Sequence, residues 1–167
     1  MKSMKCLFVS LLLCLGVAYS LSNARDRKSG DTDDETRIEK MINDTTYTIN
    51  VSSALPMGGR TVMLNSYYSL EMAKDTVRSY LPYFGRAYSI PYGGGKGLVF
   101  DGTAENYVVK DGKKGGNEIE FTVRNEEDSY TYNLSIYPNG SAYISVRGNK
   151  RQPISYIGRI DLYGKED

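Results

Sequence analysis

From Thr45 to the end of the chain, apolar and polar residues alternate in one short segment after another. In "EIEFTVR" the apolar residues are Ile119, Phe121 and Val123, with polar residues between them. The same alternation recurs over 47–51, 68–72, 130–136, 142–146 and 154–162. A β-strand places successive side chains on opposite faces, so this period predicts strands with one buried face. The alternation therefore restricts the chain to an all-β fold.

Short stretches of turn-forming residues separate these segments, among them glycines, asparagine and a lysine-aspartate pair. Asn139-Gly140 predicts a two-residue hairpin, because both residues tolerate positive φ. Weaker strands fit 60–65, 76–81, 98–100 and 104–110. The total is about nine to ten short strands, and no helices alternate with them as a parallel sheet requires. We expect an antiparallel sandwich or small barrel.

The amino terminus has the pattern of a secretory signal peptide. Lys2 and Lys5 precede the apolar run "CLFVSLLLCLGVA", which is too short to be a stable membrane span. Small residues suit cleavage after Ser20, with a second position after Ala24. We therefore expect a signal peptide over 1–20, no transmembrane segment after its removal, and a periplasmic or secreted protein that can also be held at the cell envelope.

A polar leader and one helix follow the signal. Residues 21–31, "LSNARDRKSGD", have no period and are predicted to be disordered. Thr32 then suits a helix N-cap, and Ile38, Met41 and Ile42 fall on one helical face. We expect a single β domain over 32–167 with an N-terminal helix over 33–43.

Composition excludes several chemistries. Cys6 and Cys14 both lie in the signal, and the chain has no histidine. The exported domain therefore has no disulfide, no thiolate and no imidazole, so we expect no zinc site, no histidine-based nucleophile and no cofactor. Removal of Lys2 and Lys5 changes the formal charge from +1 to −1, which does not favour a nucleic-acid partner.

An outer-membrane barrel would show the same alternation with its apolar face toward lipid. Strands of six or seven residues are shorter than the roughly nine to eleven needed to cross a bilayer. The chain also ends in "YGKED", without the terminal aromatic residue usual in such barrels. These features favour an apolar interior.

The segment "LPYFGRAYSIPYGGGKGLVFDG" (81–102) is the candidate functional site. A phosphate-binding loop is disfavoured, because Lys96 is followed by glycine and then by a predicted strand. If the segment binds a ligand, aromatic and cationic side chains would form the site: Tyr83, Arg86, Tyr88, Tyr92 and Lys96. The alternative is architectural: the tyrosines cap one end of the β domain and hydrogen-bond to loop carbonyls, and the glycines permit a close turn.

Four stretches carry a family resemblance: "ALPMGGR" (54–60), "YLPYFGRAYSIPYGGGKGLVFDG" (80–102), "YPNGSAYI" (137–144) and "ISYIGRI" (154–160). Over residues 38–162 the chain resembles DUF4251, a family of exported Bacteroidota proteins with no assigned function. The resemblance implies export and an all-β domain. It implies no catalytic residue.

Two functions remain at this level. The first is a non-catalytic domain that binds a small ligand or a cell-envelope component through 81–102. The alternative is a periplasmic hydrolase, such as a glycosidase, that uses paired carboxylates. Its candidate residues are Asp101, Glu105, Glu118 and Glu120. Their positions along the predicted strands indicate instead that each carboxylate faces solvent by itself. We assign no catalytic residue.

Overall fold

The computed structural model describes residues 33–89 and 97–164. Within these ranges eight strands form one sheet: β1 (Thr46–Pro56), β2 (Val62–Ala73), β3 (Thr76–Leu81), β4 (Leu98–Asp111), β5 (Asn117–Arg124), β6 (Ser129–Ile136), β7 (Ser141–Gly148) and β8 (Ile154–Ile160). A short 3-10 turn, η1 (Lys113–Gly115), connects β4 to β5.

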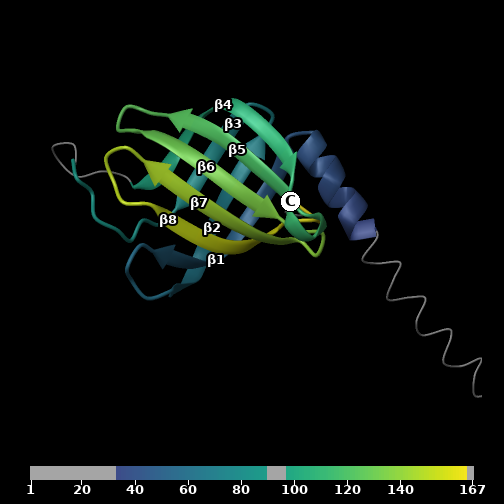
Figure 1. Ribbon diagram of the computed structural model, residues 1–167, viewed down its shortest axis with the longest axis horizontal. Helices are drawn as coiled ribbons and strands as arrows, with labels where there is room; N and C mark the ends of the chain where they lie inside the picture. The colour runs from purple at the N-terminus through teal and green to yellow at the C-terminus, as the bar shows by residue number, and fades with distance from the viewer. Residues whose placement is uncertain (1–32, 90–96, 165–167) are drawn as a thin grey trace, which may run out of the picture.

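The sheet is a closed barrel in which each strand pairs antiparallel with the next (Figure 1). β1 also pairs with β8, with Ile49 opposite Ile160 and Ala54 opposite Tyr156. Because neighbours are antiparallel, connections alternate between the two ends of the barrel. The end with the β1–β2, β3–β4, β5–β6 and β7–β8 connections is called the strap end, and the other is the helix end. The predicted all-β fold is confirmed as a barrel.

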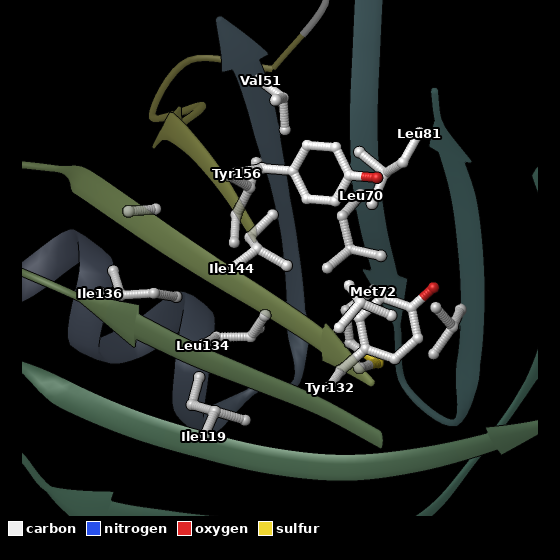
Figure 2. Packing of buried hydrophobic residues seen from close by; sticks show 14 of the residues in the cluster. Val51, Leu70, Met72, Leu81, Ile119, Tyr132, Leu134, Ile136, Ile144 and Tyr156 are labelled. Carbon is white, nitrogen blue, oxygen red and sulfur yellow. The ribbon is translucent and has the colours of Figure 1, made fainter. Parts of the chain in front are cut away.

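Inward-facing side chains fill the barrel, as expected for eight strands. Along β6 the buried residues are Tyr130, Tyr132, Leu134 and Ile136, all fully buried. Figure 2 shows Tyr132 and Leu134 in the same cluster as Ile144 of β7. The period-two alternation is therefore the division between barrel core and outer wall.

The predicted N-terminal helix is present over 33–43 and lies across the helix end (Figure 1). Ile38 and Ile42 are each only 2% exposed and belong to the barrel core. Arg37 Nη1 donates a hydrogen bond to the Leu162 carbonyl at 3.1 Å, which ties the helix to the segment after β8. In the described ranges, no helix is both long and apolar enough to cross a membrane.

Two strands are longer than the sequence pattern suggests, which explains eight strands where about nine or ten were expected. β2 includes both 62–65 and 68–72, and β4 includes both 98–100 and 104–110. Each contains a register shift: β2 carries 64–67 between its Ser53–Met63 and Val51–Tyr68 pairs. A bulge interrupts the alternation without ending the strand. The pattern therefore divides β2 at its bulge, whereas it divides β4 at 101–103, before the register shift between Glu105 and Val108.

The β6–β7 hairpin also differs in detail from the expected two-residue turn. Its loop is 138–140, because Tyr137 N donates to the Ser141 carbonyl at 2.9 Å and Gly140 N donates to the Tyr137 carbonyl at 2.9 Å. Gly140 has φ +78°, while Asn139 does not have positive φ. Pro138 favours a type I turn, and a left-handed glycine completes the three-residue hairpin.

Candidate functional site

The described part of the β3–β4 connection, residues 82–89, crosses the strap end and is called the strap. It docks on the β7–β8 connection through an isolated bridge between Ala87 and Arg151. Tyr88 N donates to the Lys150 carbonyl at 2.7 Å, and Gln152 N donates to the Arg86 carbonyl at 2.9 Å. Main-chain hydrogen bonds thus fix the strap in place.

The Tyr83 side chain links two parts of the strap end. Its hydroxyl lies 3.0 Å from the Arg86 carbonyl oxygen and 2.9 Å from the Gln152 carbonyl oxygen. A Cβ at Gly85 would lie 2.5 Å from the Tyr83 hydroxyl, so this close approach requires glycine. Tyr156 Oη donates to the Pro82 carbonyl at 2.7 Å. The Tyr83 hydroxyl therefore joins the strap to the β7–β8 connection, and Tyr156 of β8 holds the strap at the Pro82 carbonyl.

Arg151 forms the centre of a buried cluster beside the strap. Its side chain is 7% exposed, and Nη2 lies 3.1 Å from Glu127 Oε2. The guanidinium lies 5.2 Å from the Tyr83 ring centroid and 5.6 Å from that of Tyr130. Tyr130 in turn stacks on Phe100 at 5.2 Å. The result is one cluster in which a guanidinium lies over two tyrosine rings, one of which stacks on Phe100.

A second carboxylate joins the two neighbouring loops. Asp128, 7% exposed, accepts hydrogen bonds from Ser129 N at 2.8 Å, Asn149 N at 3.2 Å and Lys150 N at 2.9 Å. These bonds link the β5–β6 and β7–β8 connections. The surface on which the strap docks is therefore itself held together by a buried polar network.

Burial raises the pKa of four phenols near this end. Burial raises the pKa of Tyr130 to about 12, although the Arg151 guanidinium opposes the shift. Burial also raises the pKa of Tyr132 and Tyr156 well above the usual value, and that of Tyr83 in the same direction. All four hydroxyls stay protonated at neutral pH and can donate hydrogen bonds.

The structure describes three of the five candidate site residues. Tyr83 is half-buried and directed at loop carbonyls, while Arg86 and Tyr88 are exposed, with Tyr88 70% exposed. Tyr92 and Lys96 lie outside the described residues. Phe84, not among the candidates, is 40% exposed beside Arg86. The described strap therefore presents one apolar, one cationic and one phenolic side chain to solvent.

The candidate hydrolase carboxylates lie singly on the outer wall of the barrel, and all are exposed. Asp101 Oδ1 is 3.4 Å from Arg78 Nε, and Glu105 Oε2 is 3.4 Å from Arg124 Nε. Glu118 Oε2 accepts from Ser135 Oγ at 2.9 Å. Among the described residues, no cluster of three or more acidic, histidine or cysteine side chains could hold a metal ion. This arrangement gives the hydrolase alternative no support.

Residues 30–160 match the family described as "Domain of unknown function (DUF4251)". The chain belongs to this family. A crystal structure of a DUF4251 family protein from Bacteroides eggerthii DSM 20697 has a similar fold, with a TM-score of 0.61 and 14% sequence identity. The match covers 79% of this chain and 89% of that chain. A search of curated proteins gives no significant match.

Membership of the DUF4251 family confirms the resemblance found in the sequence and leaves function to the site itself. Sequence reasoning missed Arg151 and Gln152, against which the strap docks, and Glu127, which pairs with Arg151. They lie in short charged loops, "NEED" and "NKRQP", where solvated side chains are the ordinary expectation. Only the tertiary approach of the β5–β6 and β7–β8 connections brings them to one place.

Proposed function

We propose that this DUF4251 domain is an exported, non-catalytic module that binds a small ligand or a cell-envelope component through the segment 81–102. Export is supported by Lys2, Lys5 and the apolar run that follows them. The module would act in the periplasm or outside the cell, free or held at the envelope.

One observation carries the binding proposal: the strap has a fixed main chain and exposed recognition side chains. The bonds to Lys150 and Gln152 order its backbone, while Phe84, Arg86 and Tyr88 face solvent. Aromatic residues and arginine dominate binding energy in protein interfaces. A backbone ordered before binding also lowers the entropy lost on association.

The binding test uses the double variant Arg86→Ala/Tyr88→Ala, expressed in the native host and purified from the envelope fraction. Mass spectrometry should find that species copurifying with the wild-type protein are lost, while the free energy of unfolding changes by less than about 0.5 kcal/mol. Tyr143→Ala, at an exposed tyrosine of β7, is the matched control. Retention of the same species by the double variant would contradict binding through the strap.

Export is tested separately by amino-terminal sequencing of the host protein. A mature terminus at Leu21 or Arg25 is expected. An intact Met1 in a cytoplasmic fraction would refute this part of the proposal.

A further inference from the structure

Two methionines lie on the surface, one in the β1–β2 connection and one at the start of β2. Met57 is 65% exposed and Met63 is 70% exposed, whereas Met72 is buried in the barrel core and Met41 is half-buried. Peroxides oxidise an accessible thioether sulfur to a sulfoxide, and burial protects it. Among the described residues, Met57 and Met63 are therefore the methionines most open to an oxidant.

The two sulfur atoms differ in their hydrogen bonding. Ser53 Oγ donates to Met63 Sδ at 3.3 Å, and the two residues are directly opposite each other in the β1–β2 ladder. Within 33–89 and 97–164, the Met57 sulfur has no such donor. Exposure alone would make the two methionines equivalent, so the Ser53 hydroxyl is what distinguishes them.

The hydrogen bond comes to the Met63 sulfur from the barrel wall. The next pair in the ladder, Ala54 and Val62, belongs to the core or packs against it, so Ser53 and Met63 point to the outer wall. Ser53 is nevertheless buried, whereas Met63 is exposed. One side of the Met63 thioether therefore faces the Ser53 hydroxyl, and the other side faces solvent.

This arrangement matters because a thioether sulfur has two lone pairs. Transfer of oxygen to one lone pair or to the other gives the two epimers of methionine sulfoxide, which different reductases restore. In Met63 one lone pair accepts the hydrogen bond from Ser53. A peroxide that arrives from solvent meets the other lone pair.

We propose that Met63 is an oxidation site at which hydroperoxides form one sulfoxide epimer in excess, because Ser53 shields one of the two lone pairs. The free lone pair attacks the terminal oxygen of the peroxide and forms the S–O bond while the O–O bond breaks. The proton of that terminal hydroxyl moves to the departing oxygen. Sulfur is oxidised by two electrons, and the peroxide is reduced to water or an alcohol.

The product has a consequence for the reaction that follows. Repair of Met63 requires a two-electron reduction specific for the epimer in excess, since each class of reductase accepts only one epimer. Neither Ser53 nor Met63 belongs to the segment 81–102, so this modification does not depend on the binding function proposed above.

The experiment treats the folded domain with hydrogen peroxide, removes the oxidant and separates the epimers of each tryptic peptide by liquid chromatography and mass spectrometry. Cleavage after Arg60 places Met57 and Met63 in different peptides. Met63 sulfoxide should show an excess of one epimer of about twofold or more, since a hydrogen bond of ordinary strength biases the side chain by at least that factor. Met57 should give nearly equal amounts, and Met72 should stay reduced.

Two serine variants test the shield. Ser53→Ala should give equal epimers at Met63, whereas Ser52→Ala should keep the excess, because the neighbouring Ser52 hydroxyl donates to the Ile157 carbonyl and not to sulfur. Both variants should keep the wild-type circular dichroism spectrum. An excess that persists in Ser53→Ala would overturn the proposal.

Two measurements on the wild-type chain keep the test independent of how the variants fold. Peroxide treatment in urea should give equal epimers at Met63, because unfolding separates it from Ser53. Treatment of the oxidised native domain with each of two reductases of opposite epimer specificity should restore most of the Met63 thioether with one of them only. Equal epimers at Met63 in the folded wild type, or oxidation of Met72 before Met63, would overturn the assignment.

Discussion

The two ends of the barrel are closed by different chemistry. At the helix end, Ile38 and Ile42 insert into the core, and closure is mainly apolar burial. At the strap end, Arg151 lies between two tyrosine rings, and main-chain hydrogen bonds hold the strap. Apolar closure stabilises without requiring specific partners, whereas in polar closure each buried group that lacks a hydrogen bond lowers the stability.

This difference indicates where recognition is expected. Buried apolar side chains offer a ligand nothing to recognise, while ordered polar loops carry exposed aromatic and charged groups at their surface. The helix end therefore accounts for stability, and the strap end combines stability with the means to bind. The following predictions test that division, from the largest expected effect to the smallest.

Removing the apolar closure should have the largest effect. Ile38→Ala/Ile42→Ala deletes two nearly fully buried side chains, and each such deletion costs about 2–5 kcal/mol. We expect a loss of about 5 kcal/mol in urea unfolding, with Glu39→Ala, on the exposed side of the helix, nearly neutral. A loss below about 1 kcal/mol would show that the helix does not contribute to the core.

Removing the polar closure should cost less. Arg151→Ala deletes a buried ion pair with Glu127 and the contacts with both tyrosine rings, for an expected loss of about 3 kcal/mol. Arg78→Ala is the control. This exposed arginine has two ion pairs, to Glu71 and Asp101, but an exposed ion pair contributes at most about 1 kcal/mol to the free energy of unfolding. Equal losses in the two variants would argue against a structural role for the buried cluster.

A smaller change isolates the strap anchor. Tyr83→Phe removes only the hydroxyl between the Arg86 and Gln152 carbonyls, which should cost about 1 kcal/mol. Hydrogen exchange of the Tyr88 amide should also become faster, because the strap loses one attachment. Tyr88→Phe, at an exposed phenol, should change neither quantity. Unchanged exchange in Tyr83→Phe would mean that the main-chain bonds alone hold the strap.

The smallest effect should appear near pH 10, where the pKa difference of Tyr130 first acts on stability. The pKa of Tyr130 is about 12 in the folded protein against about 10 in the unfolded chain, so the unfolded state releases its proton first. Stability should be constant up to about pH 9, then fall as pH rises from 10 toward 12. Melting temperatures of wild type and Tyr130→Phe, each compared with its own value at pH 8, should show a shallower decline in the variant. Parallel declines would contradict a role for this phenol.

The sequence predicted the fold because its signals are local. The period of two in "EIEFTVR" depends only on which face of a strand is buried, and Ile38, Met41 and Ile42 define a helix face in the same way. Bulges in β2 and β4, by contrast, depend on register with neighbouring strands. The site depends on contacts still more distant: Tyr83 reaches Gln152, and Arg151 reaches Glu127. Such contacts leave no period in the sequence.

The bond between Arg37 and the Leu162 carbonyl has a geometric consequence for attachment. It brings the start of the domain and the segment after β8 together at one pole of the barrel, opposite the strap (Figure 1). Any tether that continues from Asp33 therefore leaves from the pole farthest from the strap. A domain anchored through its amino terminus would present the strap outward, away from the surface that holds it.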